Sequence, residues 1–341
     1  MDNTVENAVR NAVIFTGALR TIRKSIRYFK ENVIDVAKGT VHIFLCVQND
    51  TYHRNEDWEQ WFKEQLGDHI QSIEWFSVET HPDWVAHRER QLGHLWLDHS
   101  WKTYLRSSGS MIEYYQLQLA YMAMCEAEQR GGFRYDYVIR ARTDSIYAKP
   151  VDFHWLNWSV QEVAARMERV RTEMQSANIE DSARNLLMYF MCTMLSDDTL
   201  PNLAAIWANY SPCETDRILM DGLSAKDLSA NALHQYIKQG RYILTIRKNN
   251  LYIIQRCLFH LIPTLGTMYG FMRSPGADDY WFNAEGQFRD ACYYSCVSVF
   301  DYNTALEDKS VLPADQWNER DFFTEDGGMA VPHMLFCMVR K

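Results

Sequence analysis

The chain has 341 residues, of which 47% are hydrophobic and 23% charged, so it can bury a substantial core and lacks the composition of a disordered protein. Its formal net charge of −9 argues against nucleic acid or an anionic membrane as the main partner, because both demand a basic surface. Eight scattered cysteines, no secretory leader pattern and no apolar run of membrane-spanning length predict a cytosolic protein without a transmembrane segment.

Strand and helix patterns alternate at the start of the chain. Continuous or mixed apolar runs at 12–16, 41–47 and 70–78 are typical of strands, and the first two have the composition of strands buried on both faces. Helical patterns follow the first strand as far as residue 32, and recur over 55–66. This alternation predicts a parallel sheet with right-handed crossovers.

A helix predicted over 110–130 leads into the stretch Tyr135–Asp144, which is expected to be a buried strand with a charged end. Side chains alternate along a strand, so Arg140, Arg142 and Asp144 are expected on one side if the extended backbone continues. In an open α/β sheet, ligands bind at this carboxyl end. Arginine suits phosphate, and a carboxylate beside phosphate needs a cation between them. The pattern therefore indicates either a diphosphate held by arginine and a divalent metal, or a simple Arg–Asp ion pair.

The patterns in the rest of the chain are mostly helical. Helices are expected over 159–176, 182–195 and 251–262, and short strands over 242–246 and 297–300. A segment at 276–288 mixes acids, amides and aromatic residues, as is typical of a polar pocket. Because no repeat or low-complexity linker interrupts the chain, a single elaborated α/β domain is expected.

The motif from Phe15 to Arg20, the long helix and the stretch Tyr135–Asp144 together resemble nucleotide-sugar glycosyltransferases of the GT-A fold. The similarity is greatest to soluble enzymes of large algal viruses and of bacterial surface-glycan clusters, and it is firmest over residues 12–147. It implies a Rossmann-like, mostly parallel central sheet flanked by helices, with a helix-rich C-terminal elaboration. Residues 1–341 would form one domain, in which 12–147 binds the nucleotide sugar and 148–341, with a helical insertion, binds the acceptor.

The resemblance also implies a binding site for the donor. Six residues are expected to contact its nucleotide and diphosphate: Thr16, Gly17, Arg20, Arg140, Arg142 and Asp144. Asp144 matches the last acid of the family's metal-binding Asp-x-Asp motif, whereas Arg142 replaces the first acid. The resemblance implies a divalent Mn²⁺ or Mg²⁺ ion at Asp144, with His333 near the C-terminus as a second ligand.

Inverting members of the family use an acid at the start of a helix as the general base for the acceptor hydroxyl. Glu285 fits this layout best, followed by Asp279 and then Asp216. Each of them also fits a purely structural role, because carboxylates are favoured at helix N-termini.

The resemblance predicts a glycosyltransferase, a hexosyl- or pentosyltransferase, that moves a sugar from a UDP-sugar to a hydroxyl of an oligosaccharide or glycoprotein glycan. It would act in the cytoplasm, which is the host cytoplasm if the protein is viral. One alternative is a catalytically silent nucleotide- or carbohydrate-binding protein on the same fold, because the first acid of the metal motif is missing. Another is a nucleotidyltransferase, which would release pyrophosphate rather than UDP.

Overall fold

The structure is a computed structural model. The residues it describes are 9–48, 57–77, 81, 109–147, 150–151, 153–194, 214–221, 223–246, 251–261, 288, 291–292, 295–302, 311–313 and 336–340.

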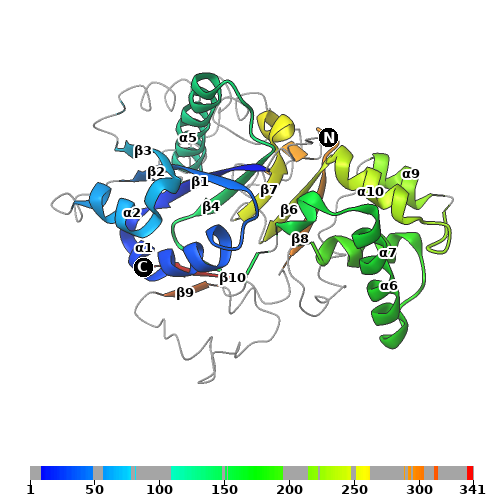
Figure 1. Cartoon of the computed structure of the whole chain (residues 1–341). Coiled ribbons are helices and arrows are strands. Elements are labelled where there is room, and N and C mark those ends of the chain that lie inside the picture. The colour runs from blue at the N-terminus through cyan, green and yellow to red at the C-terminus, as the bar shows by residue number, and fades with distance from the viewer. Residues whose placement is uncertain are drawn as a thin grey trace, which may run out of the picture.

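Among these residues, seven strands form one sheet in the order β3-β2-β1-β4-β7-β6-β8 (Figure 1). The strands are β1 (Arg10–Ala18), β2 (Thr40–Gln48), β3 (Ile70–Phe76), β4 (Tyr137–Arg142), β6 (Tyr242–Ile246), β7 (Leu251–Gln255) and β8 (Ser298–Tyr302). Strand β7 is antiparallel to both of its neighbours, and every other neighbouring pair is parallel. The chain therefore has an α/β fold with a mixed, mostly parallel sheet, which confirms the general class that the alternating patterns predict.

Helices cover both faces of this sheet. On one face lie α1 (Ile22–Phe29) with the π-helical turn η2 (Lys30–Ile34), α2 (Trp58–Leu66) and the turn η4 (His154–Asn157). The other face is covered by the long helix α5 (Gly109–Gly131). Short 3-10 turns follow β1, α2 and β7; they are η1 (Leu19–Thr21), η3 (Gly67–His69) and η5 (Arg256–Leu261). Because helices cover both faces, the middle stretches of the central strands β1 and β2, at 12–15 and 43–47, are continuously apolar and buried.

Four further helices gather beside β6 and β8, on the side of the sheet away from β3 (Figure 1). They are α6 (Val160–Ser176), α7 (Ala183–Cys192), α9 (Glu214–Met220) and α10 (Ala230–Gln239). Helix α6 begins with a capping box, in which the Ser159 hydroxyl accepts from the Glu162 N–H and the Glu162 carboxylate accepts from the Ser159 N–H. Helix α10 ends at Gly240, which adopts a left-handed φ of 60°.

A small second sheet joins the end of the chain to the segment after β4. Strand β10 (Phe336–Arg340) pairs antiparallel with β5 (Ser145–Tyr147) and parallel with β9 (Val311–Pro313). Strand β5 starts one residue after Asp144. The described part of the C-terminal tail therefore lies beside the turn that carries Asp144.

The predicted helix over 251–262 is wrong. Residues Leu251–Gln255 form strand β7, which pairs with β4 and β6, and only the following turn η5 is helical. A short, continuous apolar run fits a buried strand as well as a buried helix. Here the pairing partners on both sides decide between the two, because a strand in the middle of a sheet satisfies its backbone polar groups only through its neighbours.

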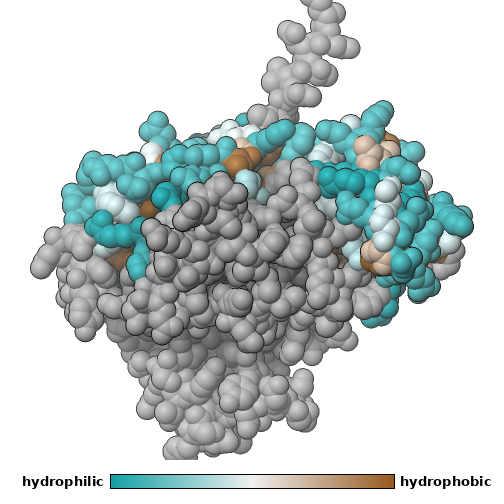
Figure 2. Space-filling view, turned by 90° about the horizontal axis from the view of Figure 1, so that it is seen from below, coloured by the Kyte–Doolittle hydropathy of each residue, from teal (hydrophilic) through white to brown (hydrophobic). Residues whose placement is uncertain are grey.

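Where its surface belongs to described residues, the face in Figure 2 is mainly hydrophilic, with hydrophobic residues in small groups. None of the described helices combines the length and the apolar character that a bilayer crossing requires.

Candidate functional site

The site predicted from the sequence lies where the strand order of the main sheet reverses. From β1 the chain proceeds to β2 and β3 on one side, whereas β4 lies on the other side of β1. Residues at the carboxyl ends of β1 and β4 are in register, with Thr16 opposite Arg142 and Ile14 opposite Arg140. In open α/β sheets, ligands bind outside the carboxyl ends of the strands at such a switch point. The topology thus brings Thr16, Arg140 and Arg142 to the edge where a ligand is expected.

Gly17 allows the turn after β4 to pack tightly against the end of β1. Its φ is +144°, and a Cβ atom on it would lie 2.2 Å from Oγ1 of Thr143. The Thr143 N–H donates to the carbonyl of Thr16 at 3.0 Å, and its hydroxyl donates to the carbonyl of Ala18 at 2.8 Å. Only glycine accommodates both the backbone conformation and this close approach. Gly17 therefore positions the turn that carries Asp144.

Four charged side chains form a network at this edge. Nη2 of Arg140 donates to Oε1 of Glu113 at 2.6 Å, and Nη1 of Arg142 donates to Oε2 of the same carboxylate at 3.0 Å. Nε and Nη2 of Arg142 donate to the two oxygens of Asp144, each at 2.9 Å. Strand β4 ends at Arg142, and Asp144 follows in a turn, yet its carboxylate still meets the Arg142 guanidinium. The Arg–Asp ion pair that the alternative interpretation predicts is therefore present, although it leaves ligand binding open.

These four side chains are enclosed, and their formal charges sum to zero. The side chain of Arg140 is 1% exposed and that of Asp144 is 5% exposed, whereas Glu113 and Arg142 are 16% and 17% exposed. Two guanidinium groups and two carboxylates balance one another. An unbalanced charge in so enclosed a position would cost several kcal/mol, so each arginine depends on an acid nearby.

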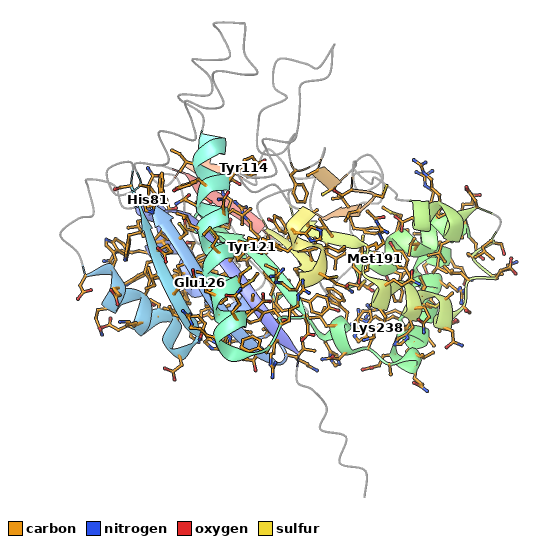
Figure 3. All side chains as sticks on the ribbon, turned by 90° about the horizontal axis from the view of Figure 1, so that it is seen from above. His81, Tyr114, Tyr121, Glu126, Met191 and Lys238 are labelled. Carbon is orange, nitrogen blue, oxygen red and sulfur yellow. The ribbon has the colours of Figure 1, made fainter. Side chains whose placement is uncertain are left out.

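Helix α5 supplies the acid that sequence reasoning missed, Glu113. The helix lies on the sheet with its first turns at the carboxyl edge, where Nε2 of Gln116 donates to the carbonyls of Gly17 and Cys46. Figure 3 shows Tyr114, Tyr121 and Glu126 marking successive positions along α5. Because a helix that precedes a parallel strand runs antiparallel to it, its first turn lies at the carboxyl edge. The sequence signal that could have identified Glu113 is an acid and an amide three residues apart, Glu113 and Gln116, in the first turns of this helix.

Two buried hydroxyl groups adjoin the arginines. Among the described residues, Oγ1 of Thr16 has no hydrogen-bond partner although Thr16 is 1% exposed, and the hydroxyl of Tyr252 also has none. Tyr252 lies opposite Arg140 on β7, and burial raises the pKa of its phenol, an effect that the positive charge of Arg140 only partly offsets. The phenol is therefore neutral and able to donate. Unsatisfied buried hydroxyls of this kind are candidate ligand contacts.

The acids of this network do not fit a divalent metal ion as they are arranged. All four carboxylate oxygens of Glu113 and Asp144 already accept hydrogen bonds from arginine, and two guanidinium groups balance the charge of the two acids, so a divalent ion would add a second cation to an enclosed site. Within the described part of the chain, no three histidine, cysteine or acidic side chains are grouped to hold a metal ion. His333, the second predicted metal ligand, lies outside the described residues.

The structure describes only part of the remaining predicted site. Arg20 is in the turn η1 directly after β1, but its side chain is outside the described part. Glu285 and Asp279, the first two candidates for the general base, also lie outside it.

Asp216, the third candidate base, lies at the amino edge of the sheet, opposite the carboxyl edge that carries the arginines. Its carboxylate is completely buried and accepts hydrogen bonds from the hydroxyls of Tyr236, at 2.5 Å, and Ser298. Ser298 pairs with Tyr242 at the amino ends of β8 and β6, level with Tyr137 at the start of β4. The geometry therefore favours a structural role for Asp216, which ties α9 to α10 and β8.

No protein-family model matches this chain, and no curated protein matches it.

Proposed function

We propose that the protein is a glycosyltransferase of the GT-A fold, which moves a sugar from a UDP-sugar to a hydroxyl group of a glycan. The observation that carries the proposal is the position of Arg140, Arg142 and Thr16 at the switch point of a mostly parallel sheet. Arginine forks bind phosphate oxygens through paired, charge-assisted hydrogen bonds. A nucleoside diphosphate is therefore the ligand class that this edge suits best.

In the proposed reaction, the bond between the anomeric carbon and the diphosphate oxygen breaks, and a bond to the acceptor oxygen forms. Arg140 and Arg142 stabilise the negative charge that develops on the departing diphosphate. The acceptor hydroxyl gives its proton to a carboxylate, for which Glu285 and Asp279 remain the first candidates and Asp216 the last. Mn²⁺ or Mg²⁺ at Asp144 and His333, which the resemblance implies, stays a prediction.

The first test is a thermal-shift titration with UDP, with and without Mn²⁺, on the wild type and on Asp144→Ala. A ligand that binds only the native state stabilises it by about 2.7 kcal/mol at about 100 times its Kd. We expect UDP to raise the melting temperature of the wild type, and Asp144→Ala to reduce the shift because Arg142 loses its anchor. Asp35→Ala, which removes an exposed aspartate paired with Lys30, is the matched control and should respond like the wild type.

The alternatives give different products. Release of UDP from a nucleotide sugar in the presence of glycan acceptors supports the transferase, whereas release of pyrophosphate would indicate a nucleotidyltransferase. UDP binding without turnover of any donor would support a silent binding protein. No response to UDP under any condition would contradict the proposal.

A further inference from the structure

The guanidinium group of Arg142 lies between two carboxylates. It donates to Asp144 through Nε and Nη2 and to Glu113 through Nη1, so the two acids approach it from different sides. The acids come from distant parts of the chain, one from the first turns of α5 and one from the turn after β4. Two carboxylates around one cation is also the arrangement in which proteins hold divalent metal ions.

The charge balance shows what Arg142 contributes. With it, the network of Arg140, Arg142, Glu113 and Asp144 is neutral. Without it, these described side chains would comprise two enclosed carboxylates and one guanidinium, and repulsion between the carboxylates would favour uptake of a proton or a cation. Arginine stays protonated at any pH that a protein experiences. Arg142 is therefore a permanent cation built into the chain.

The position of Arg142 also suits contact with an anion. Its side chain is 17% exposed, whereas the side chain of Arg140, two residues earlier on β4, is 1% exposed. An incoming diphosphate therefore meets Arg142 first. Its side-on pairing with Asp144 fixes the plane of the guanidinium, so little side-chain freedom remains to be lost when a ligand binds.

We propose that Arg142 takes the place of the divalent cation at this site, and that the diphosphate is bound by guanidinium groups without a metal ion. The identity of the ligand rests on the proposed function, whereas the arrangement of charges belongs to the chain itself. Glu113 and Asp144 are then positioning residues, which hold the guanidinium instead of a metal.

The test uses the electron paramagnetic resonance signal of free Mn²⁺, which weakens when the ion binds to protein. We expect the wild-type chain to leave the signal unchanged, because the two guanidinium groups already balance the charge of both acids. Arg142→Met exposes Glu113 and Asp144 to each other, so it should bind Mn²⁺ and weaken the signal. The double variant Arg142→Met, Asp144→Asn should lose this binding again. Arg130→Met removes an exposed arginine in the last turn of α5, the helix that carries Glu113, and should behave like the wild type.

Two outcomes overturn the inference. One is Mn²⁺ binding by the wild type that Asp144→Asn abolishes, a comparison that does not depend on whether Arg142→Met folds. The other is a folded Arg142→Met variant that leaves the free-ion signal unchanged.

Calorimetric titration with UDP separates this inference from the proposed function. We expect the Kd of the wild type to differ by less than about twofold between EDTA and Mn²⁺, and Arg142→Met to bind at least about tenfold more weakly in EDTA. A wild type that needs Mn²⁺ to bind UDP would contradict the inference but not the proposed function. A wild type that binds no UDP in either buffer would contradict the proposed function, and the Mn²⁺ signal would still decide the inference.

Discussion

Glu113 is the side chain on which the two arginines of the site depend. Both of its carboxylate oxygens accept hydrogen bonds from guanidinium groups, one from each arginine. Breaking a buried pair by removing one partner typically costs about 3–5 kcal/mol, because the other charge is left without compensation. Arg140 is almost completely buried, and it lies within a strand that is covered on both faces. The acid on α5 makes that position possible.

Gly17→Ala should disturb the site through the backbone. The new Cβ would collide with Oγ1 of Thr143, so the turn that holds Asp144 must move, and the strained φ adds to the cost. We expect a loss of about 1–3 kcal/mol in the free energy of unfolding, measured by urea denaturation, together with weaker UDP binding.

Gly67→Ala is the matched control, because Gly67 also has a positive φ, of 58°, while a Cβ there meets nothing within 4 Å. It should lose less stability and leave UDP binding unchanged. Similar behaviour of the two variants would contradict the role given to the contact with Thr143.

Helix α5 connects the two edges of the sheet. At the carboxyl edge it places Glu113 against the arginines of β4. At the amino edge its Glu128 accepts two hydrogen bonds from Arg256, at 2.8 and 2.7 Å, and one from the N–H of Tyr135. A helix anchored by ion pairs at both ends has little freedom to slide along the sheet. The position of Glu113 is therefore set by the whole length of the helix.

Tyr236→Phe should separate the structural role of Asp216 from a catalytic one. The variant removes a hydroxyl that donates to a completely buried carboxylate, and we expect a loss of about 1–3 kcal/mol in the free energy of unfolding. UDP affinity should not change, because this network lies at the amino edge of the sheet.

Tyr242→Phe is the control within the same cluster. Its hydroxyl makes only a long bond of 3.5 Å to the carbonyl of Ile237, and its ring stacks on Tyr236. Tyr242→Phe should lower the free energy of unfolding by less than Tyr236→Phe does. A marked loss of UDP binding in Tyr236→Phe would instead connect Asp216 to the site.

One sheet unites the two halves of the chain. Strands β1 to β4 come from residues before 147, whereas β6, β7 and β8 come from residues after 241, and β7 pairs directly with β4. The described part of the C-terminal tail then returns to β5. Two cores, one on each face, enclose side chains from both halves. The donor and acceptor halves that the resemblance implies would therefore share one continuous scaffold.

The reactivity of the cysteines tests this arrangement. Cys46, Cys192 and Cys292 are buried, and burial raises the pKa of each thiol far above its usual range, so that almost no thiolate forms at neutral or mildly basic pH. Cys257 and Cys296 are exposed. We expect iodoacetamide to label the two exposed thiols first in the native protein, as followed by mass spectrometry of peptides.

Protein unfolded in urea is the control, because all of these thiols should then react at similar rates. Rapid labelling of Cys46 in the native protein would contradict the packing of β2 between the two layers of helices.

Local patterns were sufficient for much of the fold. The apolar runs of β1 and β2, the glycines that end α5 and the serine and glutamate that cap α6 act within a few residues, so a single stretch of chain contains the information needed to predict them. The alternation along β4 likewise places Arg140 and Arg142 on one face, because a strand has a period of two.

Long-range pairing determined the rest. Whether 251–255 is a strand depends on β4 and β6 as neighbours, and the role of Asp216 depends on Ser298, which is 82 residues away. The sequence shows two arginines near an aspartate, but the acid that balances them, Glu113, is on a helix 27 residues before Arg140. The energy of a charge in an enclosed site depends on the groups that lie next to it in space. The periodicity of residues along the chain does not indicate which groups these are.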